Sequence, residues 1–190
     1  MPFQYIAVDN DPHFVVDVSG VEEKLCFDVF ANPGEVLPLL RDEEKGKVLK
    51  RLILSYKFES HIRYSLGLTV NAELSSPAVS DPGRKHVPTF ISKIAILYKN
   101  KTRIVFSARK VFVQGEEHRW RAESTLVQSD IKIHFESRFK AILELTEIGV
   151  RFVVLRHMSP VPSAKKVNFL GFYVENDETL SRECSGILGK

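Results

Sequence analysis

The chain has 190 residues, of which 44% are hydrophobic and 27% charged, and its formal net charge at pH 7 is +3. These values are typical of one soluble globular domain, and they exclude a disordered polyampholyte, a collagen-like repeat and a coiled coil. The apolar runs are far shorter than the ~20 residues of a membrane span. The small net charge, without a long basic run, argues against a nucleic-acid partner.

The predicted elements are almost all β-strands. Short runs rich in Val, Ile, Phe and Tyr, some of them alternating with polar residues, favour strands. Turn signals containing Gly or Pro separate several of these runs, at Asn32–Gly34, Ser80–Gly83 and Gln114–Glu116. The expected strands are 13–18, 25–30, 68–74, 90–98, 103–113, 131–135, 140–145, 150–155 and 168–174. This pattern predicts an all-β fold, a single antiparallel β-sandwich or barrel-like domain with little helix.

Only two segments are compatible with helix. Residues 35–41 follow Gly34 and are expected to form one short helical turn. Residues 45–57 carry apolar side chains at helical spacing, but their second half reads equally well as a strand.

The usual enzyme and metal-binding signatures are absent from the sequence. The six histidines are scattered, and no two have the spacing of metal ligands. We therefore expect neither a metal nor a cofactor.

The segment that carries chemistry is Asp11-Pro12-His13. The β-carboxyl of Asp11 can attack its own main-chain carbonyl and close a cyclic anhydride, because the proline nitrogen is a better leaving group than an ordinary amide. Attack within one residue needs no encounter, and His13, the next residue, is expected to protonate the departing nitrogen or to orient the carboxyl. The alternative is a simple loop with a proline at the start of a strand.

Four further sets of residues are open to more than one interpretation. Cys26 and Cys184 are compatible with one disulfide or with two buried thiols. Asn100 begins an N-glycosylation sequon, which has meaning only in a secreted protein. Trp120 is expected to be a packed aromatic rather than part of an exposed ligand face. A solvated face is likewise expected, rather than a site for sulfated glycans, for Arg138, Lys140, Arg151 and Arg156.

Residues 9–16 resemble the Asp-Gly-Asp-Pro-His-Phe stretch of inter-alpha-trypsin inhibitor heavy chains. Other segments are similar to that family in the same order along the sequence, at residues 25–29, 32–37, 68–74, 169–174 and 184–189. The resemblance covers nearly all of the sequence and points to the C-terminal region of the heavy chains. The Asp-Pro-His motif is also similar to that of von Willebrand factor type D modules.

The resemblance implies a function for the Asp-Pro bond. In the family, the precursor is cut between Asp and Pro, and the freed Asp is esterified to the chondroitin sulfate of bikunin. The heavy chain later moves to hyaluronan and stabilises extracellular matrix. Carried onto this sequence, the cut falls between Asp11 and Pro12. Residues 1–11 then end the preceding heavy-chain segment, and residues 12–190 are a released C-terminal β domain.

The same resemblance implies an extracellular protein, although the first residues show no secretory signal. In that setting we expect a Cys26–Cys184 disulfide. We expect no enzyme, since the chemistry is at most a single-turnover acyl transfer. The alternatives are a non-cleaving β-sandwich interaction module and a cytosolic relative with two thiols.

The sequence departs from the family pattern in three places. Asn10 stands where the family has Gly, and residues 47–65 look inserted. Ala72 replaces the Gly of an Asn-Gly pair, which should weaken a tight hairpin turn there.

Overall fold

The computed structural model describes residues 13–17, 24–29, 31–44, 67–76, 89–99, 102–158, 168–175, 179–181 and 183–188. Within these residues the protein forms antiparallel strands and no helix, which confirms the all-β prediction. The strands are β1 (His13–Asp17), β2 (Lys24–Asp28), β3 (Val36–Asp42), β4 (Leu68–Ser75), β5 (Phe90–Tyr98), β6 (Thr102–Ser107), β7 (Lys110–Val113), β8 (Glu116–Arg119), β9 (Ser124–Gln128), β10 (Ile131–Phe135), β11 (Lys140–Leu145), β12 (Val150–Met158) and β13 (Asn168–Val174).

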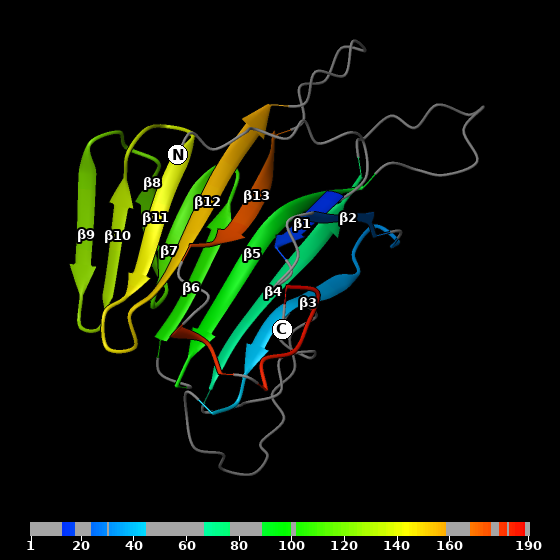
Figure 1. The fold of residues 1–190 in the computed structure, drawn as a ribbon. Helices are drawn as coiled ribbons and strands as arrows, with labels where there is room; N and C mark the ends of the chain where they lie inside the picture. Colours follow the sequence, from blue (N-terminus) through cyan, green and yellow to red (C-terminus); the bar gives the residue numbers. More distant parts are fainter. Residues whose placement is uncertain are drawn as a thin grey trace.

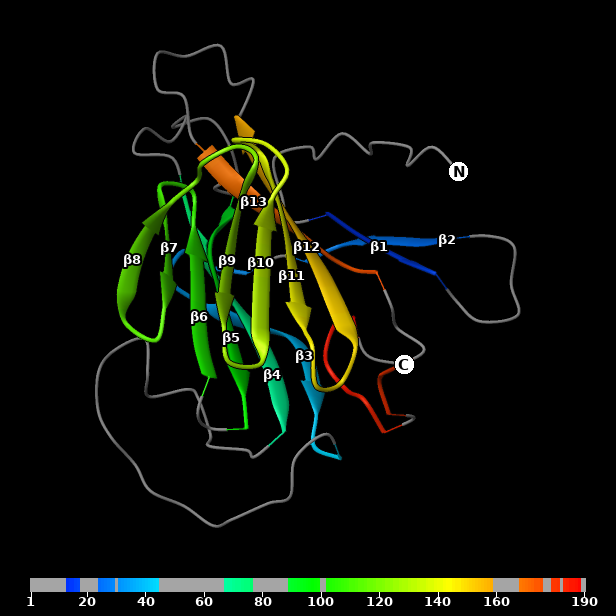
Figure 2. The same cartoon turned by 90° about the vertical axis from the view of Figure 1, so that its left-hand side faces the viewer.

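Two large sheets form the body of the domain. One has the strand order β3-β4-β5-β6-β7-β8, and the other has the order β13-β12-β11-β10-β9. Figures 1 and 2 show these sheets as two layers that face each other, with the small β1–β2 hairpin projecting to one side. Nearly all connections are between neighbouring strands, as expected for an up-and-down antiparallel arrangement.

The core lies between the two sheets and follows from alternation along each strand. In β10, Ile131, Ile133 and Phe135 are at most 3% exposed, whereas Lys132 between them faces solvent. The same period of two buries Phe152 and Val154 of β12. One continuous apolar cluster therefore joins both layers.

Trp120 closes one side of this core. Its side chain is 8% exposed, and its ring packs against those of Phe106 and Phe135, with centroids 5.9 and 5.8 Å away. The indole Nε1 donates a hydrogen bond of 3.0 Å to the Ser107 carbonyl. Trp120 is thus a packed aromatic with a satisfied donor, and the alternative of an exposed ligand face is wrong.

The predicted helical turn at 35–41 is wrong, because Val36–Asp42 is the strand β3. The strand buries Leu37, Leu39 and Leu40 in the core, and this burial stabilises it over a helical turn. Pro38 is tolerated because β3 is the outer strand of its sheet, where a missing N–H costs no ladder bond. The ambiguous segment 45–57 lies outside the described residues.

Two further expectations need correction. The run 103–113 is two antiparallel strands, β6 and β7, which turn at Ala108–Arg109. There is no turn at Asn71–Ala72, because both residues lie inside the continuous strand β4. Ala72 is fully buried there, so its methyl group fills the core and disturbs no hairpin.

Two of the predicted turns are confirmed. Asn32–Gly34 turns the backbone before β3, with Gly34 at a φ of +86° and the Glu35 N–H donating to the Asn32 carbonyl. Gln114 and Gly115, both at positive φ, join β7 to β8. Positive φ at both loop residues is characteristic of the type I′ turn of a two-residue hairpin. The signal at Ser80–Gly83 lies outside the described residues.

Candidate functional site

The Asp-Pro motif leads directly into the first strand. β1 begins at His13, and the register of the hairpin pairs His13 with Asp28. Asp11 and Pro12 come just before this point and lie outside the described residues. The cut between them therefore stays a prediction. The hairpin does place an acidic residue, Asp28, across the ladder from the predicted assistant His13, and the sequence alone did not indicate this pairing.

The predicted disulfide and glycosylation residues are placed only in part. Cys26 pairs with Val15 in the β1–β2 ladder, but its side chain is outside the described set. Cys184 is 3% exposed and belongs to the apolar core. Asn100 is also outside, between Tyr98 and Thr102, which pair across the β5–β6 ladder. The bridge and the sequon therefore remain predictions.

The closing residues of the sequence are bound along the free edge of β3. Arg41 and Ser185 exchange two backbone hydrogen bonds of 2.7 and 2.8 Å, and the Leu188 N–H donates to the Leu39 carbonyl at 2.8 Å. Gly186 has a φ of +106°, and a Cβ there would lie 2.8 Å from the Leu39 oxygen. Only glycine fits at this point, which explains a glycine in the closing segment.

Asp42 anchors the same C-terminal segment from the end of β3. Its carboxylate is fully buried, and it accepts hydrogen bonds from the backbone N–H of Ser181 at 2.7 Å and of Glu44 at 3.1 Å. A buried carboxylate is stable only when its oxygens are satisfied in this way. The tail is thus held by a polar anchor as well as by Leu180 and Cys184 in the core.

The segment Phe169–Tyr173 of β13 packs closely on β12. Phe172 contacts Phe152 with ring centroids 5.1 Å apart, while the ring of Phe169 stacks on His157 at 5.0 Å. A Cβ at Gly171 would lie 3.1 Å from Nε2 of His157. The glycine therefore makes room for the imidazole, whose Nε2 is buried without a hydrogen-bond partner among the described residues.

Burial lowers the pKa of His157 below its ordinary value of 6.5. The unfolded protein then binds a proton more readily than the folded protein, so the free energy of unfolding should fall as pH drops through about 6.5. We expect His157→Phe to reduce this loss of stability between about pH 7 and pH 5. Urea unfolding at a series of pH values measures it, and identical pH slopes in both proteins would contradict the prediction.

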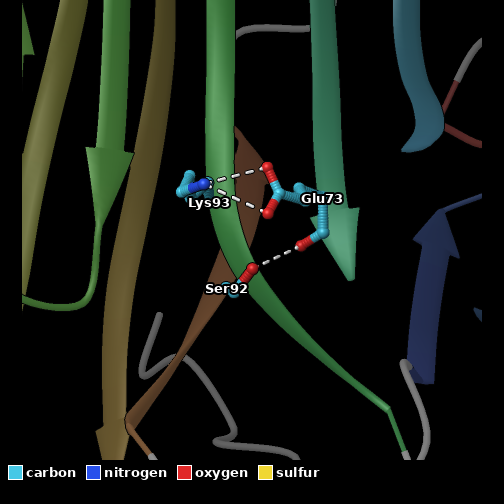
Figure 3. Close-up of polar contacts among 3 residues, drawn as sticks. All are labelled: Glu73, Ser92 and Lys93. Atoms are coloured by element: carbon cyan, nitrogen blue, oxygen red, sulfur yellow. Dashed lines mark hydrogen bonds and ion pairs between the residues drawn. The ribbon is translucent and has the colours of Figure 1, made fainter. Parts of the chain in front are cut away.

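A polar cluster lies on the outer face of the six-stranded sheet, where β4 meets β5. Figure 3 shows Lys93 Nζ donating to both carboxylate oxygens of Glu73, each at 3.1 Å, and Ser92 Oγ donating to the Glu73 carbonyl at 3.1 Å. The ladder shifts register at this place, so that Ser92 is the extra residue of a β-bulge. The Ser92 hydroxyl thus satisfies a carbonyl beside the bulge.

The Glu73–Lys93 pair should contribute little to stability, because Lys93 is 44% exposed. A double-mutant cycle with Glu73→Ala and Lys93→Ala is expected to give a coupling of about 0.2–1 kcal/mol. Chemical unfolding of the four proteins measures it. A coupling several times larger would show that the pair is an essential part of the bulge.

Polar and charged side chains also connect the two large sheets at one end. The Tyr98 hydroxyl donates to Glu147 Oε2 at 3.4 Å, Glu147 forms an ion pair with Lys99, and Thr102 donates to Asp130 at 3.3 Å. Tyr98 and Lys99 belong to one layer, and Glu147 comes from the turn after β11 in the other. Burial raises the pKa of Tyr98, so its hydroxyl stays protonated and remains a donor.

The outer face of the five-stranded sheet carries a shallow hollow of about 310 Å³. Its lining mixes both charges with one apolar side chain: Thr125, Lys132, His134, Ile142, Glu144 and Arg151. Arg151 forms an ion pair with Glu175 at 3.1 Å, and Thr125 and His134 share a hydrogen bond of 3.0 Å. The hollow has no catalytic constellation, and Lys132 and Arg151 in its lining are offset by Glu144 and by the Glu175 partner of Arg151.

The basic residues considered for sulfated glycans do not gather on one face. Lys140 forms an ion pair with Glu136, and Arg151 is paired with Glu175. The alternation of β12 places Arg156 on the same side as Phe152 and Val154, opposite to Arg151. Arg156 therefore does not share a face with Lys140 and Arg151, and the latter two are already ion-paired.

Two further features were not found in the part of the protein that the structure describes. Among the residues that it describes, no group of three or more His, Cys, Asp and Glu side chains is arranged to hold a metal ion. Within the same residues, no helix has the length and apolar character needed to cross a bilayer.

The sequence that forms this two-layer β fold matches a known protein family. The sequence profile for the C-terminus of the inter-alpha-trypsin inhibitor heavy chain matches residues 65–190. The protein therefore belongs to the inter-alpha-trypsin inhibitor heavy chain family and represents its C-terminal region, which confirms the resemblance.

Individual heavy chains are similar over the whole sequence. Heavy chain H1 of Bos taurus is 26% identical over 195 residues, covering 100% of this chain. Heavy chain H3 of Mesocricetus auratus is 25% identical and also covers 100%, and human heavy chain H6 is 28% identical and covers 97%. The present sequence spans only 19% of the length of the first two relatives and 13% of the third.

Proposed function

We propose that this protein is a propeptide-type C-terminal region whose Asp11–Pro12 bond is cut in an acyl transfer. The observation that carries the proposal is the match to inter-alpha-trypsin inhibitor heavy chains over the full sequence, including the residues before the family profile begins. In the sequence, Asp11 and Pro12 come immediately before His13, the first residue of β1. A scissile bond at the start of a strand leaves the following fold intact after the cut.

The chemistry needs only groups near the bond. The ionised β-carboxylate of Asp11 attacks the main-chain carbonyl carbon of the same residue, the bond to the Pro12 nitrogen breaks, and that nitrogen takes a proton from the imidazolium of His13. The product upstream is a cyclic anhydride. A sugar hydroxyl then opens the anhydride, forming an ester and restoring a carboxyl group. Intramolecular attack gains several kcal/mol from orientation, and proton donation typically adds a factor of about 10²–10⁴.

The reaction consumes its own substrate, so the protein turns over once and is not an enzyme in the ordinary sense. The hydroxyl belongs to the chondroitin sulfate of bikunin, and later to hyaluronan, through the parent heavy chain. Residues 1–11 stay with the heavy chain, and residues 12–190 leave as a folded domain in the extracellular space. The proposed function of this region is therefore to support the ester transfer of the heavy chain, which stabilises extracellular matrix.

An extracellular location also makes the Cys26–Cys184 disulfide part of the proposal. Closing so long a loop is worth roughly 4–5 kcal/mol in the loop-entropy account. Thiol counting on the denatured, secreted protein is expected to find no reactive thiol. Two reactive thiols would contradict the bridge and favour the cytosolic alternative.

The proposal is tested by expressing the protein behind a secreted reporter in cells that make chondroitin sulfate. Intact mass and N-terminal sequencing of the medium should reveal a fragment that begins at Pro12. The reporter should carry a glycan that alkali removes, as expected for an ester.

A non-cleaving interaction module is the second candidate, and Asn10 in place of the family glycine favours it. Here a single uncut species is expected in the same experiment, and Asn10→Gly serves as the matched variant. Cleavage that appears only in Asn10→Gly would show that the fold is retained and the chemistry lost.

A further inference from the structure

The two large sheets have four outer strands, and three of them are protected. β3 is covered by the C-terminal segment through the bonds of Ser185 and Leu188. β8 has four residues, and three of these are Glu or Arg. β13 lies against the other sheet, with Phe169 stacked on Phe90 at 5.5 Å. Natural sheets use such coverings, short lengths and charges to prevent pairing with another molecule.

The fourth outer strand, β9, has none of these protections among the described residues. Its sequence Ser-Thr-Leu-Val-Gln contains no charge and no proline, and Val127 is 69% exposed. Within the part of the protein that the structure describes, only β10 pairs with it. Figure 1 shows β9 at the outer border of its layer. An uncharged edge strand with an exposed β-branched side chain is a template for a further strand.

The pattern of β9 is nearly symmetric about Leu126. Polar Ser124 and Gln128 stand at its ends, and the β-branched Thr125 and Val127 flank the centre. A twofold axis through Leu126 would place Thr125 of one copy opposite Val127 of the other, and Ser124 opposite Gln128. Pairs of β-branched residues are favourable across antiparallel strands, and self-complementarity is what a twofold interface requires.

The backbone hydrogen bonding of β9 is also compatible with this twofold pairing. β9 and β10 are joined by the two-residue turn Ser129–Asp130, and Gln128 pairs with Ile131 at its base. In such a hairpin the closing pair is hydrogen-bonded and the bonding alternates along the ladder. Gln128, Leu126 and Ser124 thus bond to β10, so the N–H and C=O groups of Thr125 and Val127 point outward. These are the two residues that the twofold axis pairs.

The charges of the neighbouring strand do not oppose this arrangement. Lys132 lies opposite Val127 in the β9–β10 ladder, and His134 lies opposite Thr125. In the paired state, Lys132 of one copy and His134 of the other lie on the same line across the joined sheet. Val127 of the first copy and Thr125 of the second, both uncharged, lie between them. No like charges become direct neighbours across the new ladder.

We propose that β9 pairs antiparallel with β9 of a second copy of this protein, which joins the five-stranded sheets of two molecules into one continuous sheet. The interface is small, so the association is weak and reversible. The proposal concerns self-association and does not depend on cleavage at Asp11.

Sedimentation equilibrium of the full-length protein over rising concentration tests this pairing. The mass should move from one molecule toward two, and Val127→Lys should weaken the association at least about tenfold, because it places a charge on the edge. Phe139→Lys is the control, since Phe139 is also exposed at 53% but lies in the β10–β11 turn. A wild type that stays monomeric, or two variants with the same effect, would overturn the proposal.

Cysteine cross-linking tests the register. Thr125→Cys mixed with Val127→Cys should give a disulfide between the two proteins, because directly paired Cα atoms lie about 5.5 Å apart. Thr125→Cys alone should link poorly, since its counterpart is two residues along the ladder. Peptide mapping separates these bridges from any that involve Cys26 or Cys184. Efficient linking of Thr125→Cys to itself, or no linking in the mixture, would contradict the twofold register.

Discussion

Replacement of Asp11 by Ala is expected to leave the secreted protein in one piece, with no fragment beginning at Pro12. The variant lacks the β-carboxyl that closes the anhydride in the proposed reaction. His13→Ala keeps the nucleophile but loses the proton donor, so it should slow the cut by about 10²–10⁴. Intact mass of medium samples taken over time measures both rates.

The matched control for this experiment is Asp9→Ala. Asp9 is a carboxylate of the same segment, two residues before Asp11, but it is not next to the scissile bond. Cleavage at the wild-type rate is expected. A cut that persists in Asp11→Ala, or that disappears equally in Asp9→Ala, would mean that another agent recognises and cleaves the segment.

Asp42→Ala is expected to lower the free energy of unfolding by about 2–4 kcal/mol. The carboxylate is fully buried and accepts the backbone N–H groups of Ser181 and Glu44. Its removal leaves the Ser181 donor buried and unsatisfied. The C-terminal segment should then detach from β3 before the core unfolds. Chemical unfolding gives the energy, and hydrogen exchange at the amides of Ser185 and Leu188 follows the detachment.

Glu43→Ala separates this effect from a general change of charge. Glu43 is the next residue and forms an ion pair with Arg41, but its side chain is 52% exposed. A loss below about 1 kcal/mol is expected, with the two tail amides still protected. Equal losses in both variants would show that Asp42 acts through its charge and not as an anchor of the tail.

Strands with strong alternation or dense β-branched residues were predictable from the sequence. β5, β10, β11 and β13 have the bounds expected from composition alone. β8 was not predicted, because its residues Glu-Glu-His-Arg read as a loop; the tight turn at Gln114–Gly115 imposes its pairing. β3 was mistaken for a helical turn, since its neighbouring Leu39 and Leu40 break strict alternation. The register shift between Pro38 and Leu40 explains this.

The role of Asp42 as the anchor of the C-terminal segment could not be predicted from the sequence. Asp42 and Ser181 are 139 residues apart, and no local pattern tells that an aspartate at the end of a strand will be buried. The requirement for glycine at position 186 likewise arises from the approach of Leu39. The proposed cleavage at Asp11–Pro12 is the opposite case, because the proposal depends only on adjacent residues and could be made from the sequence.

The central claim is that the main-chain carbonyl of Asp11 becomes an activated acyl group without help from a protease. The direct measurement is to incubate the purified, uncut protein with hydroxylamine and determine the mass of the upstream fragment. An anhydride predicts a fragment that ends in a hydroxamate at Asp11, together with a second fragment that begins at Pro12. A cut that requires an added protease and yields only the free acid would contradict the account.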